Sequence, residues 1–201
     1  MVGMKYSEIV DYDKLDPFKE ECIRRFKATF DKLDRMGISI VPESIGETAV
    51  AVDLGLGDFY LAFGVEGLGT KNMIAEEMAL AEKEGIGIGL EERTLFSGIG
   101  QDEMAMTLND LSCIGATPFL FEPIVATGDG DYLANKDRAA GLIDGFERGA
   151  KIAGVAIPGG ETPTLKGIVG TYTLDLAGGS LGIIRPKTRL KKEKRIGRGG
   201  K

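Results

Sequence analysis

The sequence predicts a domain of the α+β class, in which a mixed, mostly antiparallel sheet is packed by two to four helices. The chain has 201 residues, 43% of them hydrophobic, which suffices for one domain with a substantial core, or one domain plus a tail. Two long segments repeat apolar residues at the helical period, whereas a short hairpin and a long alternating segment are typical of strands. Their order along the chain favours a single α+β domain.

The first half of the chain is expected to hold two helices and a hairpin. Between residues 14 and 36 apolar side chains recur every three or four positions, which gives a helix face that we expect in the core, and Gly37 ends this helix. Strands are expected near residues 48–54 and 58–63, because a glycine-rich turn of the hairpin type joins them. A second helix is expected from about residue 72 to residue 84.

The second half is expected to hold two more helices and three strands. Helical spacing covers residues 102–114 and 136–154. The expected strands are residues 119–127, 155–157 and 168–184, the last of them bent at Gly178-Gly179 because glycine weakens a strand.

A glycine-rich segment in the first half has the layout of a phosphate site. Residues 59–63 are a candidate buried strand, and they lead into Gly64, Gly67, Gly69, Thr70 and Lys71 before a helix begins. Glycines allow positive φ and a close approach to the backbone, while the helix start and the lysine add positive charge. A tight turn that serves only packing would show the same pattern, so both interpretations stay open.

Three acidic features could complete such a site. Glu66 lies within the glycine loop and is a candidate Mg²⁺ ligand, because Mg²⁺ takes one or two carboxylates together with phosphate oxygens. Asp102 and the pair Asn109-Asp110 lie on a predicted helix. The pair has apolar surroundings, where a bound cation, a lysine partner or an ordinary salt bridge would stabilise a carboxylate. Glu161 lies in a second glycine loop that also follows a strand.

The residue inventory favours ATP-dependent phosphoryl transfer over hydrolysis by a nucleophile. The chain contains no histidine, which excludes histidine metal sites and histidine-based catalysis within it. Phosphoryl transfer needs metal-binding carboxylates, phosphate-facing amides and a lysine, and the segment around Lys71 supplies these groups. The two cysteines, Cys22 and Cys113, lie in predicted helices, so we expect buried free thiols and a cytoplasmic protein.

Charge and hydropathy argue against nucleic-acid and membrane partners. Residues 185–201 contain nine basic residues and one acid, so residues 1–184 carry a net charge of −14 within the total of −6. An acidic body disfavours nucleic acid. We therefore expect residues 1–184 to form the domain and residues 185–201 a solvated tail or linker, with an RNA-binding tail as the less favoured alternative. The sequence contains no run of eighteen apolar residues, so we expect no transmembrane helix.

Five segments carry a family resemblance, and they occur in order along the chain: Gly64–Lys71, Asp102–Pro118, Phe121–Gly128, Val155–Thr162 and Asp175–Gly178. They resemble the Thr-Asp-Gly-Val-Gly-Thr-Lys loop, the Asp-x-x-Ala-Met-x-x-Asn-Asp-Leu-x-x-x-Gly-Ala-x-Pro segment, the strand ending Ala-Thr-Gly, the Val-Gly-Gly-Glu-Thr loop and the Asp-Val-Ala-Gly strand of one enzyme family. That family is phosphoribosylformylglycinamidine cyclo-ligase, also called aminoimidazole ribonucleotide synthetase.

The resemblance implies an ATP-dependent ligase of purine biosynthesis. In that family ATP phosphorylates the amide oxygen of formylglycinamidine ribonucleotide, and a ring-closing nitrogen then displaces phosphate to give aminoimidazole ribonucleotide. ATP and Mg²⁺ are the implied cofactors, with Glu66 and Asp110 as metal ligands and Lys71 and Asp110 as catalytic residues. The residues implied to lie near ATP and its phosphates are Gly64, Gly67, Gly69, Thr70, Lys71, Asp102, Asn109, Gly159, Gly160, Glu161 and Thr162, with Glu161 toward the substrate.

The resemblance also implies the fold of the N-terminal domain of aminoimidazole ribonucleotide synthetase and a homodimer in which two sheets pair into a β-barrel. The residues themselves favour pairing, because the apolar strands 59–63, 119–127 and 168–184 have too few helices to cover both faces of a sheet. We therefore expect a homodimer with ATP and formylglycinamidine ribonucleotide as its small-molecule ligands.

Two departures from the family pattern leave alternatives open. Glu66 stands where the family loop has Asp, so its carboxylate reaches further and the metal geometry could shift. The chain also has no counterpart of the His-Ser-Asn-Gly loop of the family's second domain, so we expect little cyclisation activity from this chain by itself. The alternatives are another ATP-using enzyme of the superfamily, similar to selenophosphate synthetase, thiamine-monophosphate kinase or the hydrogenase maturation protein, or a non-catalytic nucleotide-binding or dimerisation module.

Overall fold

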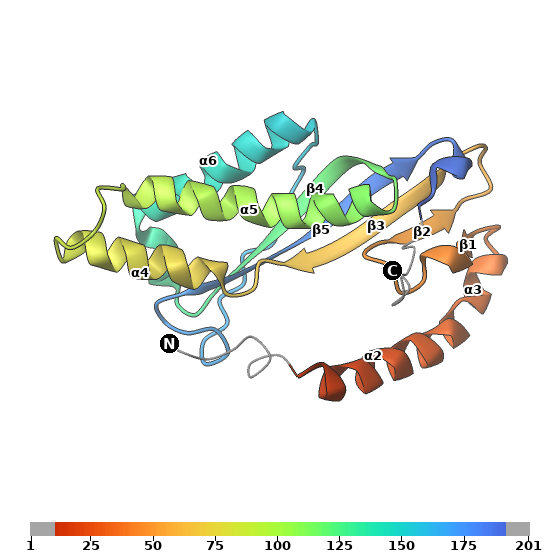
Figure 1. The fold of residues 1–201 in the computed structure, drawn as a ribbon, viewed down its shortest axis with the longest axis horizontal. Coiled ribbons are helices and arrows are strands. Elements are labelled where there is room, and N and C mark those ends of the chain that lie inside the picture. Colours follow the sequence, from red (N-terminus) through yellow and green to blue (C-terminus); the bar gives the residue numbers. More distant parts are fainter. Residues whose placement is uncertain (1–10, 192–201) are drawn as a thin grey trace, which may run out of the picture.

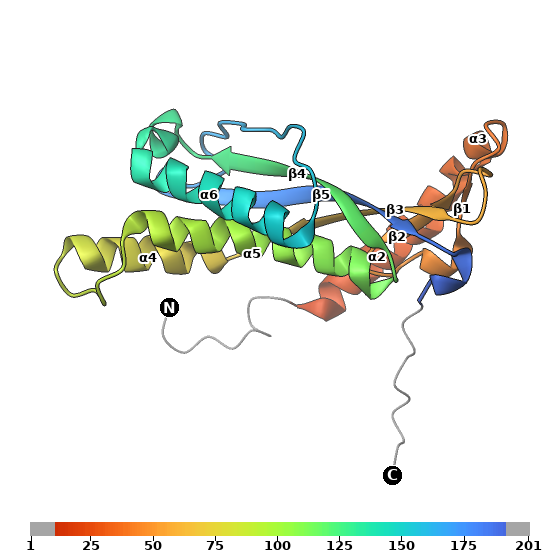
Figure 2. The same ribbon diagram turned by 90° about the horizontal axis from the view of Figure 1, so that it is seen from above.

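A five-stranded sheet lies against three long helices in the computed structural model, which describes residues 11–191 (Figure 1). The strands are β1 (Ser39–Ile40), β2 (Val50–Asp53), β3 (Tyr60–Gly67), β4 (Thr117–Thr127) and β5 (Leu174–Ile184). The helices are α2 (Tyr12–Phe26), α3 (Asp31–Asp34), α4 (Lys71–Lys83), α5 (Glu92–Cys113) and α6 (Lys136–Ala153). Figure 2 shows α4, α5 and α6 on one side of the sheet, and this two-layer arrangement confirms the predicted class.

The strand order of the sheet is β1-β2-β3-β5-β4, and every neighbouring pair is antiparallel. In the central pair, Tyr60 of β3 lies opposite Ile184 of β5, and Gly67 lies opposite Ala177. Beyond β4, the segment 156–164 forms isolated parallel bridges with that strand. The pairing is therefore mixed but mostly antiparallel, as the sequence predicts.

The hairpin of β2 and β3 is confirmed, but three of the expected strands differ from the prediction by more than two residues at one end or are absent. β3 continues four residues past the expected end, to Gly67, so the glycine-rich loop begins later than expected. The expected strand 155–157 is only a bridge at Ala156. The expected strand 168–184 begins at Leu174, and β5 passes through Gly178 and Gly179 without a break.

The central helix, α5, starts ten residues before the predicted helix 102–114. Its first half packs on α6, where the helix backbones approach closely. A Cβ atom on Gly145 of α6 would lie 2.2 Å from the carbonyl oxygen of Ser97 on α5, so only glycine fits there. This close contact explains why the part of α5 before residue 102 lacks the apolar periodicity of a helix, because a contact between backbones needs no apolar side chain.

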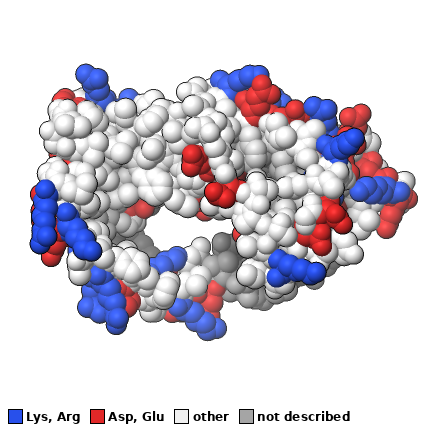
Figure 3. Space-filling view, turned by 180° about the vertical axis from the view of Figure 1, so that it is seen from behind, with Lys and Arg blue, Asp and Glu red and all other residues white. Residues whose placement is uncertain are grey.

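The first helical segment differs most from its prediction. The expected helix 14–36 is divided into α2, a 3₁₀ turn at residues 27–29 and α3. None of the α2 side chains is buried, and Phe18 is 71% exposed, so the expectation that this face belongs to the core is wrong. Figure 1 shows α2 standing apart from the sheet, and the space-filling view in Figure 3 shows open space beside it. The helix is amphipathic, and its Ile23 side chain, which is 38% exposed, lies beside Gly46, where a Cβ atom would be 3.7 Å away.

The core lies between the helices and the sheet in two clusters. The larger one joins α4, α5 and α6 to β4 and β5 through Phe96, Met104, Phe121, Phe146 and Leu176. The smaller one surrounds the β1–β2 end and includes Val41, Ala51, Ala62, Leu111 and Ile184. Within residues 11–191, no helix is long and apolar enough to cross a membrane.

The opposite face of the sheet stays open. Cross-strand register places Phe63 and Val65 of β3, Ile183 of β5 and Ile124 of β4 on this face, and each of these side chains is exposed. Figure 3, seen from behind, shows few charged side chains over this part of the molecule. An exposed apolar sheet face is typical of a surface that another molecule covers.

The residues after β5 fold back on the sheet. The Lys187 ammonium group lies 2.7 Å from a carboxylate oxygen of Asp53, and the Lys191 amide donates to the carbonyl oxygen of Ile114 at 2.9 Å. The rest of the predicted basic tail lies outside the described residues. Cys22 is partly exposed and Cys113 is exposed, so the prediction of buried thiols is wrong.

Candidate functional site

The candidate site forms where β3 ends and α4 begins. Leu68 is buried and its amide donates to the carbonyl oxygen of Leu176 at 2.8 Å, which holds the loop against β5. Gly69 has φ +68°, a value that favours glycine, and it turns the chain into α4. Thr70 is the N-cap residue and Lys71 the first helical residue, so backbone amides and a lysine lie together at a helix start. The predicted strand, glycine turn and helix are thus present.

Gly64, the first glycine expected in the phosphate loop, lies elsewhere in the structure. Gly64 lies inside β3, not in the loop, and a Cβ atom there would contact Ala49, Ser180 and Leu111 at 3.5–3.7 Å. Gly64 lies on the face of β3 that packs against α5, and this packing explains why the position holds a glycine. The glycines that remain at the candidate phosphate loop are Gly67 at the strand end and Gly69 in the turn.

Lys71 is paired with Asp102 across α4 and α5. The distance from the ammonium nitrogen to the carboxylate oxygen is 3.5 Å, and both side chains are about half exposed. An exposed ion pair of this kind stabilises by only about 0–1 kcal/mol. Lys71 could therefore exchange Asp102 for a phosphate group at little cost. Asp102, predicted to lie near ATP, serves in this state as the partner of Lys71.

The two predicted metal ligands face each other between β3 and α5. The pKa of Asp110 is raised from its usual value, first by burial and then by the negative charge of Glu66 and a hydrogen bond between the two carboxyl groups. One Glu66 oxygen also accepts from the Gly67 amide at 3.0 Å. Two adjacent carboxylates repel each other when both are ionised, and a cation between them would remove that repulsion.

The donor set of this pair suits a magnesium ion held jointly with phosphate. Among residues 11–191, no group of three or more Asp, Glu, Cys or His side chains is arranged to hold a metal ion. Mg²⁺ is usually bound through one or two carboxylates, with the remaining positions filled by water and phosphate oxygens. Glu66 and Asp110 therefore fit the ion as partners of a nucleotide, and not as a complete protein cage.

A third carboxyl group, which the sequence reasoning missed, lies beside this pair. Glu103 of α5 is 0% exposed, one of its oxygens accepts from the Thr107 hydroxyl at 3.0 Å, and the other has no hydrogen-bond partner. Burial raises its pKa to about 7, and the charges of Glu66 and Asp175 contribute. Residues 103, 107 and 110 are spaced so that they share one helix face, and this spacing indicates that Glu103 lies on the same face as Asp110.

The other predicted residues are not all brought to this centre. Asn109 is exposed and lines a groove between α5 and α6 with Leu108 and Ile152. Glu161 is bound to β4 by its backbone, because its amide donates to the Pro123 carbonyl oxygen at 2.9 Å. Gly159, Gly160 and Thr162 are exposed beside it.

The two glycine loops nevertheless lie at the same level of the sheet. Cross-strand register runs from Gly67 to Ala177, from Ala177 to Ile124 and from Ile124 to Glu161. Three strand spacings of roughly 4.8 Å separate the ends of this row by about 14 Å. The loops are thus aligned across the sheet without touching, and a ligand that contacts both must span that distance.

Comparison with known proteins gives one family. The family described as AIR synthase related protein, N-terminal domain, matches residues 46–184. Phosphoribosylformylglycinamidine cyclo-ligase of Thermococcus kodakarensis is 33% identical over 182 residues, covering 89% of this chain and 46% of the relative. The enzyme of the same name from Pyrococcus horikoshii is 35% identical over 165 residues, covering 80% of this chain and 40% of the relative. The chain thus spans less than half the length of these relatives.

Solved structures share the fold at low sequence identity. A structure of AaThiL complexed with AMPPCP and TMP matches with a TM-score of 0.53 and 11% identity, covering 91% of this chain and 45% of the other. PurLQS from Thermotoga maritima matches with a TM-score of 0.51 and 15% identity, covering 74% of this chain and 22% of the other. At these identities the likeness shows the architecture alone.

Proposed function

Since the chain belongs to the AIR synthase related protein family, of which it carries the N-terminal domain, we propose that it binds Mg-ATP at the start of α4. We propose further that it forms the nucleotide-binding part of a cyclo-ligase that converts formylglycinamidine ribonucleotide to aminoimidazole ribonucleotide. The names of the curated relatives support this reaction. The adjacent carboxyl groups of Glu66 and Asp110, next to the Lys71 helix start, are the observation that carries the proposal.

Each group has a separate task in this proposal. Lys71 leaves Asp102 and binds a phosphate oxygen, while the amides around Gly69 face the same phosphate chain. Glu66 and Asp110 hold Mg²⁺, which when bound neutralises negative charge on the phosphates. The γ-phosphoryl group passes from ATP to the amide oxygen of the substrate, and ADP leaves. A nitrogen of the substrate then attacks the activated carbon, the ring closes, and phosphate leaves with the former amide oxygen.

Glu161 and the second glycine loop are proposed to face the substrate. The row from Gly67 to Glu161 supports this role, because it places the second loop level with the phosphate loop and about 14 Å away. The cytoplasm is the proposed compartment, since purine biosynthesis enzymes act on soluble metabolites.

The test is calorimetry of Mg-ATP binding to the wild-type chain and to Asp110→Asn. The wild type should bind ATP more tightly with Mg²⁺ than with EDTA, and Asp110→Asn should lose that difference because it removes one of two carboxylate ligands. Asp34→Asn, on exposed α3, is the matched control and should behave as the wild type. If Asp110→Asn binds Mg-ATP as tightly as the wild type, the metal assignment is wrong.

A further inference from the structure

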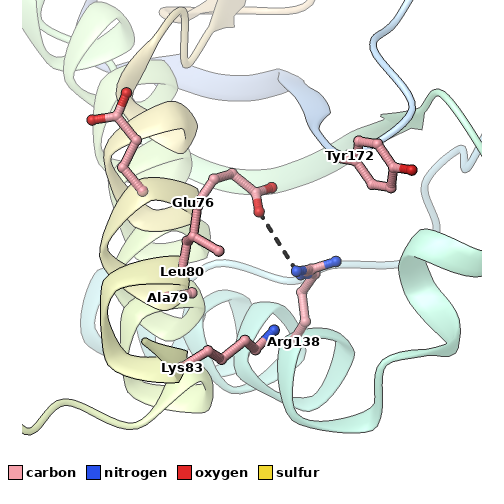
Figure 4. Close-up of a pocket in the computed structure, with 7 residues that line it drawn as sticks. Glu76, Ala79, Leu80, Lys83, Arg138 and Tyr172 are labelled. Carbon is pink, nitrogen blue, oxygen red and sulfur yellow. Dashed lines mark ion pairs between the residues drawn. The ribbon is translucent and has the colours of Figure 1, made fainter. Parts of the chain in front are cut away.

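A cavity that shares no lining residue with the glycine loop lies between α4 and the start of α6. It has a volume of about 440 Å³ and is lined by Glu76, Glu77, Ala79, Leu80 and Lys83 of α4, by Arg138 of α6 and by Tyr172 (Figure 4). This volume lies within the range of small-molecule sites. The cavity contains none of the residues assigned to the phosphate site.

One wall of the cavity is a rigid polar network built on Arg138. The Arg138 side chain is 13% exposed, and its guanidinium group donates to Glu92 at 2.9 Å and lies 3.5 Å from Glu76. Its carbon also lies 4.1 Å from the centre of the Tyr132 ring, and the Tyr132 hydroxyl donates to Glu76. These contacts fix Arg138 and Glu76 in place before any ligand arrives, which lowers the entropic cost of binding.

The facing walls are apolar and aromatic. Ala79 and Leu80 present aliphatic surface from α4, and Figure 4 shows the Tyr172 ring across the cavity from them. Tyr172 is 86% exposed. Its loop is anchored, because the Asn72 side-chain amide donates to the Thr173 hydroxyl at 2.8 Å and to the Leu174 carbonyl oxygen at 2.5 Å. An exposed ring on an anchored loop offers a stacking surface at a fixed place.

The charges around the cavity argue against an anionic ligand. Two acids, Glu76 and Glu77, balance the two cations, Lys83 and Arg138. Both cations are already paired, since Lys83 lies 3.4 Å from Glu92 and Arg138 contacts Glu92 and Glu76. A phosphate or carboxylate would therefore find no uncompensated positive charge here. A neutral ligand that hydrogen-bonds at its edges meets no such penalty.

We propose that this cavity binds a flat, uncharged heteroaromatic ring of the nucleobase class. The ring would lie between Leu80 and Tyr172 and direct its polar edge toward Glu76 and Lys83. The site is distinct from the phosphate site, because Lys71 at the start of α4 pairs with Asp102 of α5, whereas the cavity is lined by later residues of α4 and by Arg138 of α6. It is independent of the proposed ligase activity.

The test uses adenosine as an uncharged probe, with binding followed by NMR titration of the amide signals of the chain. Adenosine should give saturable shifts, and Tyr172→Ala should weaken its affinity by about tenfold or more because stacking is lost. Tyr172→Phe keeps the ring and should retain binding. Ile168→Ala changes an exposed residue of the same loop that does not line the cavity, and it should bind as the wild type.

Two further variants separate this site from the nucleotide site. Leu80→Glu should abolish the adenosine response by placing a charge against the ring, and Leu80 is exposed enough that the helix should still fold. Lys71→Ala should leave the response unchanged, and inorganic phosphate should not compete with adenosine. The proposal is overturned if adenosine gives no saturable response, if Tyr172→Ala and Leu80→Glu bind as the wild type, if Lys71→Ala removes the response, or if phosphate displaces adenosine.

Discussion

At the residue scale, Glu103 places a carboxyl group inside the interface between α5 and the sheet, with one oxygen unpartnered. Its pKa is raised from 4.5 to about 7, so between these values the folded chain keeps a proton that the unfolded chain loses. The contribution of Glu103 to the free energy of unfolding is therefore fully present below pH 4.5 and is lost as the pH rises through 7. Ionising this group costs stability, because the charge has no partner in the interior.

We predict that Glu103→Gln removes this pH dependence. The wild type should lose about 2–3 kcal/mol of unfolding free energy relative to Glu103→Gln between pH 5 and pH 8, which corresponds to the raised pKa. Urea unfolding at both pH values measures the difference. Glu77→Gln, at an exposed position of α4, is the control and should follow the wild type. Parallel behaviour of wild type and Glu103→Gln would show that Glu103 ionises freely.

The sequence revealed Glu66 and Asp110 but not Glu103, for a physical reason. A carboxylate within a glycine loop, or beside an asparagine in an apolar segment, stands out by residue type alone. A glutamate on a helix looks like an ordinary solvated side chain, and only packing of α5 on β5 shows that Glu103 is enclosed. The separation of Glu161 from Glu66 likewise depends on strand order, which no local pattern contains.

At the element scale, the contact of α5 with α6 organises the helical layer. The two helices approach at Gly145, where a Cβ atom would meet the backbone carbonyl of Ser97 at 2.2 Å. Because the obstacle is backbone and not a flexible side chain, a larger residue would have to push the helices apart. The larger hydrophobic cluster lies directly beneath this contact, so its packing depends on the same spacing.

We predict that Gly145→Ala lowers the free energy of unfolding by about 1–3 kcal/mol, the usual cost of overpacking. Gly98→Ala, in the same helical pair but facing open space, should instead raise it by about 0.5–1 kcal/mol, because alanine favours the helix. Urea unfolding of both variants measures these changes in the free energy of unfolding. Equal effects of the two substitutions would contradict the close approach of α5 and α6.

The sequence predicts the helices well where the periodicity of apolar side chains determines their bounds. α4 and α6 follow their predicted bounds closely, because each has one apolar face and clear end signals. The first half of α5 was missed, because Gly98 and Gly100 lower helix propensity while tertiary packing stabilises the helix. α2 was correctly identified as helical, but periodicity shows only that a face is apolar and not what covers it.

At the scale of the whole molecule, the sheet has one covered and one open face. The helices bury one side, while Phe63, Val65, Ile124 and Ile183 remain exposed on the other. A patch of this kind on a sheet is costly in water and favours pairing with an equivalent surface. We therefore propose a two-fold homodimer in which two open faces meet.

We predict that sedimentation velocity will show a dimer at micromolar concentration and that Val65→Glu will convert it to a monomer. A charge on the open face would be buried without a partner in the dimer but solvated in the monomer. Ile143→Glu, at an apolar position of α6 that is 65% exposed against 58% for Val65, is the matched control and should stay dimeric. A monomeric wild type, or a dimer that Val65→Glu leaves intact, would contradict the pairing.

The register of the central strand pair has a consequence for how the chain is made. β3 leaves the ribosome early and can pair at once with β2, its neighbour in sequence. Its other edge must wait for β5, since Tyr60 pairs with Ile184 far along the chain. Until translation reaches that point, β3 presents unpaired backbone groups and apolar side chains to the cell. The newborn chain is therefore most vulnerable to aggregation during synthesis of α5, β4 and α6, when chaperone binding to β3 would protect it.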